Sequence, residues 1–226
     1  MSLNKSVGNM YDWVTHTWSP ITGCKFNCKY CYAQGQPEHD MPKLHKKRLR
    51  DNLGEGNTIF VGSMADMWGF WMADSSILHV LHICRRFHKN RYLFQSKDPR
   101  RFHPFLEKMP DNVILGTTIE TNRLTSKISL APQVFQRALA LATIPDTYKR
   151  EVTIEPIMDF DLEPLLTLIK GARPDFVAVG ADSKGHNLDE PSPEKIKELI
   201  VGLSEFTQVK IKKNLKRIYP GGRDQS

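Results

Sequence analysis

Short runs rich in β-branched and aromatic residues alternate with helical patterns along most of the chain. Six strands are predicted at 58–63, 92–96, 113–119, 152–156, 176–180 and 209–211, and a first strand is expected from 18 towards 23. Strands that alternate with helices form βα units, which build a parallel sheet. The pattern therefore predicts an α/β fold.

Four segments between the strands carry apolar residues at helical spacing: 76–88, 132–143, 161–170 and 192–206. In the first, Ile77, Leu81 and Cys84 recur at helical intervals. Pro193 follows Ser192, which suits the first turn of a helix. A further helix is expected at Pro99–Lys108.

The chain length limits the number of units. A closed barrel of eight βα units takes about 250 residues, and this chain has 226 with a long first connection. We therefore expect an open, partial (βα)6 TIM-type barrel with parallel strands, as one domain over 1–226 with its core at about 11–213. A flat, doubly wound sheet is the alternative. Both architectures place the functional site at the carboxyl ends of the strands.

Polar side chains are dense at those strand ends. They are Ser63, Asp66, Gln95, Ser96, Lys97, Thr118, Glu120, Asn122, Arg123, Glu155, Asp159, Asp182, Lys184 and His186. Because the carboxyl ends of parallel strands meet at one edge of a sheet, we expect these groups to converge there.

The chain has no signal-like leader and no apolar run near the roughly 18 residues that span a bilayer. We expect a cytoplasmic protein without membrane contact. Cytoplasmic thiols stay reduced, so clustered cysteines there indicate metal ligands or catalytic groups rather than disulfides.

Three of the four cysteines fall at Cys24, Cys28 and Cys31, with the spacing C-x3-C-x2-C. Thiolates are the usual ligands of iron–sulfur clusters. Three ligands on a 4Fe–4S cube leave one iron open to a small molecule. Cys84 lies alone in an apolar helical stripe and is expected in the core.

Structural zinc is the alternative for the same cysteines. Such a site usually has four protein ligands, often from two separate pairs of cysteines. The chain has no second pair, so His16 or His39 would have to complete a Cys3His site.

The charge balance favours a polyanionic partner such as DNA or RNA, because 32 Lys and Arg against 25 Asp and Glu give a net charge of +7. Two basic runs, 42–50 and 209–217, could contact phosphates, and Trp68, Phe70 and Trp71 could stack on a base. The basic runs and the aromatic cluster also have a purely structural interpretation. Basic runs are often solvated faces, late-strand lysines protect a sheet edge, and aromatic clusters often pack.

The cysteine motif, with Tyr30 before its last cysteine, resembles the signature of the radical S-adenosylmethionine (SAM) superfamily. The stretches THTWSPITGCKFNCKYCYAQ, FVGSMADMWG, YLFQSKDPRRF and VTIEP resemble a phage-associated subfamily that also occurs in bacteria and archaea. The resemblance runs from about 11 to 222.

The resemblance implies an enzyme with a 4Fe–4S cluster held by Cys24, Cys28 and Cys31. In the superfamily, SAM binds the fourth iron through its amino and carboxylate groups. Reduction, by a donor such as a flavodoxin or ferredoxin, yields methionine and a 5′-deoxyadenosyl radical that abstracts hydrogen. A nucleic-acid base is the expected substrate, for modification, rearrangement or repair. A peptide or small metabolite is one alternative, and a zinc-stabilised basic nucleic-acid-binding module without catalysis is another.

The resemblance also implies cofactor contacts near the second strand. Tyr30 would lie near the adenine. Gly62, Ser63 and Met64 stand where the family has a Gly-Gly-Glu-like segment whose backbone meets the SAM amino group. This chain departs from that pattern because it lacks the glutamate, and Asp66 is the candidate to replace its polar role.

Further cofactor contacts are implied at strands four to six. Thr118, Glu120 and Asn122 are candidates for the ribose hydroxyls. Lys97 or Arg123 would pair with the SAM carboxylate.

Two small residues, Gly180 and Ala181, would let the backbone approach the adenine. Glu155 lies in a buried-looking strand, needs a partner, and is expected in the same site.

Overall fold

The computed structural model describes residues 3–37 and 39–221. Its main sheet has eight strands in the order β1-β2-β5-β6-β7-β8-β9-β10. Their bounds are Leu3–Lys5, His16–Trp18, Thr58–Val61, Arg91–Gln95, Val113–Thr118, Lys149–Ile154, Phe176–Val179 and Gln208–Ile211, in that order. Every pair from β2 to β10 is parallel, and β1 adds to β2 antiparallel. Because β1 and β10 end the order, the sheet is open.

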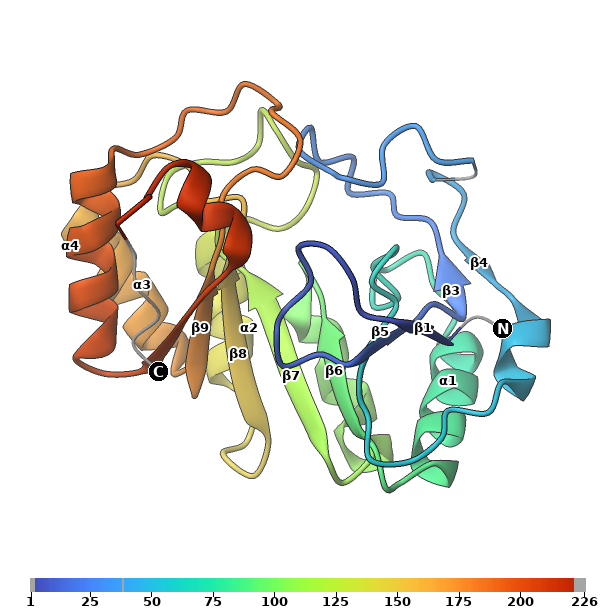
Figure 1. The fold of residues 1–226 in the computed structure, drawn as a ribbon. Coiled ribbons are helices and arrows are strands. Elements are labelled where there is room, and N and C mark those ends of the chain that lie inside the picture. The colour runs from blue at the N-terminus through green and yellow to red at the C-terminus, as the bar shows by residue number, and fades with distance from the viewer. Residues whose placement is uncertain (1–2, 38, 222–226) are drawn as a thin grey trace.

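Four α-helices connect parallel strands and lie on one face of the sheet (Figure 1). They are α1 Asp74–Arg86, α2 Val134–Ala142, α3 Leu162–Ala172 and α4 Pro193–Ser204. Three 3₁₀ helices complete the described part: η1 Lys46–Arg50, η2 Pro99–Lys108 and η3 Lys213–Arg217. A doubly wound sheet would carry helices on both faces, so the predicted open, partial barrel is confirmed.

One local prediction differs from the structure, and the helix predicted at Pro99–Lys108 is confirmed as a 3₁₀ helix. The first strand, β2, ends at Trp18 instead of starting there, because Pro20 has no N–H to donate to a ladder. The next residues form β3, Ile21–Thr22, which pairs antiparallel with β4, Lys43–Leu44, in a separate sheet. The segment Pro99–Lys108 is a 3₁₀ helix with Pro104 inside it, where an α-helix would lose a backbone hydrogen bond.

The main core lies between the sheet and the helices. Trp68 is fully buried there, with Phe94, Phe102 and Phe105 at ring distances of 5.4, 4.8 and 5.8 Å. Trp68 is therefore core and not a base-stacking platform. Phe70 is the exposed aromatic of that segment.

A smaller apolar cluster fills the other face of the sheet. Phe60, Ile114 and Phe176 from three strands pack there against Tyr11 and Val14 of the N-terminal segment. That segment crosses in front of the strands (Figure 1). The inner space that remains lies towards the carboxyl ends of the strands.

None of the helices within 3–37 and 39–221 has the length and apolar character needed to span a membrane.

Candidate active site

A cavity of about 690 Å³ opens at the carboxyl ends of the strands. Ten of the fifteen residues predicted as cluster ligands or cofactor contacts line it: Cys24, Cys28, Tyr30, Cys31, Ser63, Met64, Lys97, Thr118, Glu155 and Ala181. Residues from opposite ends of the sequence therefore meet in one space, as the parallel sheet requires.

The cysteine loop supplies three free thiols to this cavity. The Cys24 amide donates to the His39 carbonyl at 2.7 Å, which fixes the start of the loop. The Cys28 Sγ lies 3.1 Å from the Ser129 hydroxyl, and the Cys31 Sγ lies 3.2 Å from the His39 Nε2.

For two of the three thiols, Cys24 and Cys31, the protein alone disfavours ionisation. Burial raises the pKa of Cys24 to about 12, with further raising contributions from the charges of Asp66, Cys28 and Cys31. Burial also raises the pKa of the Cys31 thiol. Thiolates gathered here therefore need a cationic group to bind, which is what an iron–sulfur cluster provides.

Within 3–37 and 39–221, no three His, Cys, Asp or Glu side chains lie close enough to share one metal ion. A cluster takes each thiolate at a different iron, so its ligands stay farther apart than those of a single ion. Three free thiols at the sequence spacing C-x3-C-x2-C are the donor set that such a cluster takes.

A buried ionic network forms the wall beside the cysteines. The Arg137 Nη1 lies 2.9 Å from the Glu120 Oε2, with both side chains fully buried. The Lys97 ammonium also contacts this carboxylate. Burial alone would raise the pKa of Glu120, but the two cations hold it well below its usual range. Glu120 is therefore an ionised anchor behind the wall, outside the residues that line the cavity.

Tyr30 is fixed by the same network. Its hydroxyl donates to the Glu120 Oε1 at 2.8 Å, and the Lys97 Nζ lies 3.1 Å from that hydroxyl and 5.0 Å from the ring centre. Lys97 also donates to the Thr118 hydroxyl at 2.6 Å. An ammonium has three N–H donors, and the Lys97 ammonium has three partners: the Glu120 carboxylate and the hydroxyls of Tyr30 and Thr118. All of its donors are therefore in use. A ligand carboxylate would have to replace one of these partners.

The turn after β5 forms another part of the wall. Gly62 adopts a φ of +76°, a left-handed conformation that glycine allows without strain, and its amide donates to the Trp18 carbonyl at 2.7 Å. Asp66 then accepts hydrogen bonds from the Lys97 amide at 2.8 Å and the Ser96 hydroxyl at 2.9 Å. Burial raises the pKa of Asp66 to about 6. Asp66 thus connects the turn after β5 to the end of β6.

Glu155 lies on the far side of the cavity. It accepts hydrogen bonds from the Asn9 and Asn214 amides at 2.9 and 2.8 Å and pairs with the Lys212 ammonium. A Cβ at Gly180 would lie 2.9 Å from the Glu155 Oε1. Glycine at position 180 therefore makes room for this network, and it does not line the cavity.

A polar cluster lies deeper between the strands. The Tyr11 and Thr153 hydroxyls are 2.6 Å apart, and the Gln95 amide donates to them at 2.9 and 2.8 Å. Thr153 also contacts Glu151. Burial raises the pKa of Glu151 to about 8, so its carboxyl is largely protonated at neutral pH.

The loop after β9 covers one edge of the cavity. The Asp182 carboxylate accepts from His186 Nδ1 at 2.7 Å and from two loop amides, and Lys184 Nζ donates to the Tyr32 carbonyl at 2.6 Å. Because the carboxylate holds one ring nitrogen, the tautomer and orientation of His186 are set at the cavity wall. His186 is thus a candidate acid or base.

Comparison with known proteins identifies the family but leaves the reaction open. Residues 9–200 match the family described as "Protein of unknown function (DUF5131)". The chain belongs to the DUF5131 family. No curated protein sequence matches it.

The fold of this DUF5131 protein is similar to that of spore photoproduct lyase. A mutant of that enzyme with bound AdoMet and dinucleoside spore photoproduct has a TM-score of 0.67 at 12% identity, over 91% of this chain and 80% of that one. Another mutant with the dinucleoside has a TM-score of 0.68 at 12% identity, over 92% and 81%. At this identity the likeness concerns the fold.

Five predicted site residues of the DUF5131 protein do not line the cavity: Gly62, Glu120, Asn122, Arg123 and Gly180. Two of them, Asn122 and Arg123, are held by carboxylates outside it. Arg123 pairs with Asp159 at 2.6 Å and with Asp161 at 2.8 Å. Asn122 donates to Asp161 at 3.1 Å. These contacts of Asn122 and Arg123 join the loop after β7 to the start of α3.

Sequence reasoning missed part of the inner wall. Tyr11, Thr153 and Lys212 line the cavity without having been predicted for the site. Tyr11 lies between β1 and β2, where no periodic pattern places it. Lys212 belongs to a basic run that is typical of a surface, and the only signal was its position directly after a strand.

Proposed function

We propose that this protein is a radical SAM enzyme with one 4Fe–4S cluster. One observation carries the proposal: the three thiols of the C-x3-C-x2-C motif line a single cavity with Tyr30 and Lys97, at the carboxyl ends of an open parallel barrel. The fold shared with spore photoproduct lyase supports the superfamily. We further propose a single domain with its core at about 11–213, in the cytoplasm, and membership of the phage-associated subfamily.

Cys24, Cys28 and Cys31 would hold the cluster. When bound and reduced by a flavodoxin or ferredoxin, the cluster supplies the electron that cleaves SAM and so generates the 5′-deoxyadenosyl radical. Tyr30, locked by Glu120, presents a fixed ring beside the cysteines for the adenine. Lys97 lies in the same wall. Its ammonium would give up the hydrogen bond to a neutral partner, such as the Thr118 hydroxyl, and would pair with the SAM carboxylate instead.

The backbone at Ser63 and Met64 would meet the SAM amino group, and Thr118 a ribose hydroxyl. Ala181 would let the backbone approach the adenine. Glu155 lines the cavity on the far side and is proposed to bound the cofactor there. Its network with Lys212 holds that carboxylate in place.

A nucleic-acid base is the proposed substrate, modified, rearranged or repaired by hydrogen abstraction. The net charge of +7 supports this choice. The similar spore photoproduct lyase structures contain a dinucleoside. A peptide or small metabolite is the alternative within the same chemistry, and it predicts SAM cleavage without affinity for DNA or RNA.

A zinc-binding module is a second candidate because of one contact. The His39 Nε2 lies 3.2 Å from the Cys31 Sγ, so His39 is the histidine that would complete a Cys3His site. His16 lies in β2 and contacts the Thr15 hydroxyl instead.

Metal analysis of matched variants separates the two candidates. The protein would be reconstituted anaerobically with iron and sulfide, and its iron, sulfide and zinc contents and visible spectrum measured. We expect Cys28→Ala to lose the cluster, and Cys84→Ala, a buried cysteine outside the loop, to keep it. His39→Ala should also keep it. Tight zinc that depends on both Cys28 and His39, with no cluster in the wild type, would refute the proposal.

A further inference from the structure

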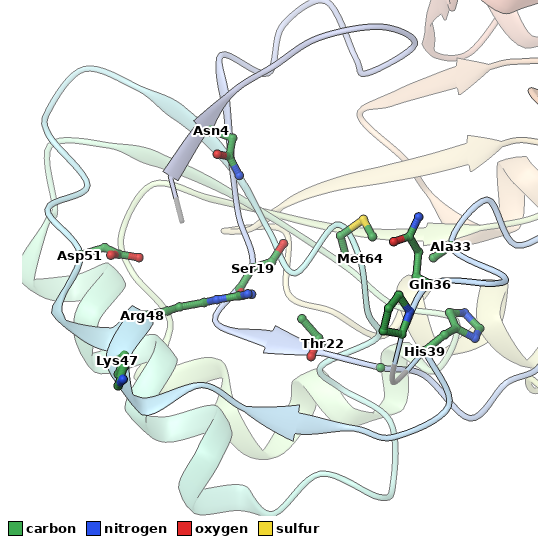
Figure 2. A pocket seen from close by; sticks show the side chains of 12 residues that line it. Asn4, Ser19, Thr22, Ala33, Gln36, His39, Lys47, Arg48, Asp51 and Met64 are labelled. Atoms are coloured by element: carbon green, nitrogen blue, oxygen red, sulfur yellow. The ribbon is translucent and has the colours of Figure 1, made fainter. Parts of the chain in front are cut away.

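A second cavity, of about 590 Å³, adjoins the cysteine cavity. The two share five lining residues: Asn4, Ser19, Ala33, His39 and Met64. Figure 2 shows Met64, His39 and Ala33 on one side of this second cavity, with Lys47, Arg48 and Asp51 on the other. A ligand in the second cavity would therefore lie directly beside the proposed active site.

Lys47 and Arg48 line this cavity and belong to a basic segment, 40–51, whose exposed cations we call the rim. Segment 40–51 contains five cations, Lys43, Lys46, Lys47, Arg48 and Arg50, and two carboxylates, Asp40 and Asp51. Lys43, Lys46, Lys47 and Arg50 are exposed. Throughout residues 3–37 and 39–221, no ion pair or hydrogen bond engages these four side chains. Asp51 accepts from the Trp18 indole at 3.1 Å, which turns one of its oxygens towards the core.

The rim is anchored to the strand that leads into the cysteine loop. The Arg48 guanidinium donates to the Ser19 carbonyl at 2.6 Å, and Figure 2 shows its side chain reaching towards Ser19. The His45 amide donates to the Pro20 carbonyl at 2.8 Å, and the His45 ring contacts the Thr22 hydroxyl at 2.7 Å. These contacts hold the exposed cations at a fixed position relative to the cavity.

We propose that Lys43, Lys46, Lys47 and Arg50 form a phosphate-binding rim that seats the backbone of a nucleic-acid strand beside the cysteine cavity. Free cations spread over eight residues suit the successive phosphates of a polymer, whereas a single small anion needs convergent donors. Such contacts fix the position of the strand without reading its sequence. The choice of substrate rests on the proposed function, but the binding itself needs neither cluster nor SAM.

Charge-matched variants test the rim. One variant reverses Lys46, Lys47 and Arg50 to Glu. The control reverses Arg85, Arg86 and Lys108 to Glu; these are also exposed and unpaired among the described residues, but they precede β6 and β7 at the opposite edge of the sheet. Both variants change the net charge equally. Circular dichroism and the thermal midpoint would show that each is folded.

Fluorescence anisotropy of a labelled oligodeoxynucleotide, single- and double-stranded, would be measured at several salt concentrations. We expect wild-type affinity to fall with salt, and the rim variant to bind at least about tenfold more weakly at low salt. Its log–log salt slope should shrink by about 0.7–0.9 for each phosphate that the variant no longer neutralises. The control should keep the wild-type slope.

Three outcomes would overturn the rim. These are equal weakening in both variants, no wild-type binding to either oligonucleotide, and displacement of the oligonucleotide by inorganic phosphate at equal phosphate concentration. The assay uses protein without cluster or SAM. If the rim does not bind DNA, the proposal that the protein cleaves SAM still stands. If the protein does not cleave SAM, the DNA-binding result still stands.

Discussion

Segments 42–50 and 209–217 each contain five Lys or Arg residues, yet they lie on opposite sides of the molecule and use their charge differently (Figure 1). In the first, Lys46 and Lys47 are exposed and unpaired among the described residues. In the second, Lys212 is buried against Glu155 and Lys213 pairs with Asp12. Equal charge in the sequence thus becomes exposed, unpaired cations in one segment, whereas the other uses Lys212 and Lys213 in ion pairs.

The difference follows from where each segment begins. Segment 209–217 starts in β10, so alternate side chains turn towards the inner face of the sheet. Lys210 covers the Phe176 ring at 4.4 Å, and burial lowers its pKa. Segment 42–50 lies mostly in η1, outside the main sheet, where the ammonium groups reach solvent. Only free charges can bind a polyanion without first breaking an existing ion pair.

The largest expected effect comes from breaking the buried ion pair between Lys212 and Glu155. Lys212→Met should cost about 3 kcal/mol of the free energy of unfolding, because it leaves the largely buried Glu155 carboxylate without its cation. Chemical denaturation measures this change. Lys47→Met is the control and should leave stability unchanged. A destabilisation below about 1 kcal/mol for Lys212→Met would show that the two segments do not differ as described.

A smaller effect is expected at Glu151, near Lys212 on the inner face. The pKa of Glu151 rises from an ordinary 4.5 to about 8 on folding, mainly through burial. Between these pH values the folded state binds the extra proton, so this carboxyl makes the protein less stable as pH rises. Glu151→Gln should therefore be more stable than the wild type by about 2 kcal/mol at pH 7.5 and similar at pH 4.

Denaturation of both proteins across this pH range provides the measurement. Equal stability at pH 7.5, with the same pH slope for wild type and variant, would mean that Glu151 is ionised in the folded protein.

The smallest effect is expected at Lys213, an exposed residue of segment 209–217. Lys213 and Asp12 form a pair at 3.0 Å in which both side chains are more than half exposed. Lys213→Ala should change the free energy of unfolding by less than about 0.5 kcal/mol, and salt should weaken even that. A destabilisation as large as that of Lys212→Met would show that burial does not separate the two lysines.

Much of the fold could be predicted because it depends on local patterns. The predicted strands at 58–63, 92–96 and 113–119 match β5, β6 and β7 within a few residues. The first strand was misplaced because the predicted stretch, from 18 towards 23, contains Pro20, which has no N–H to donate to a strand ladder. The antiparallel β1 was missed because three residues are too few for a pattern.

The candidate site could be predicted only where residues follow strand ends or form a motif. Cys24, Cys28 and Cys31 have both signals, and the structure brings them to one cavity; their role as ligands stays a prediction. Tyr11 reaches the cavity through a segment without regular structure. The pairing of Lys212 depends on Glu155, 57 positions away. Contacts of that kind depend on tertiary packing, which sequence patterns do not record.

We propose that SAM is cleaved reductively in the cysteine cavity. The most direct measurement is 5′-deoxyadenosine by mass spectrometry, after anaerobic reconstitution and addition of dithionite and SAM. We expect 5′-deoxyadenosine from the wild type and Cys84→Ala, and none from Cys24→Ala, Cys28→Ala or Cys31→Ala. A colourless protein that holds tight zinc and forms no 5′-deoxyadenosine would contradict it.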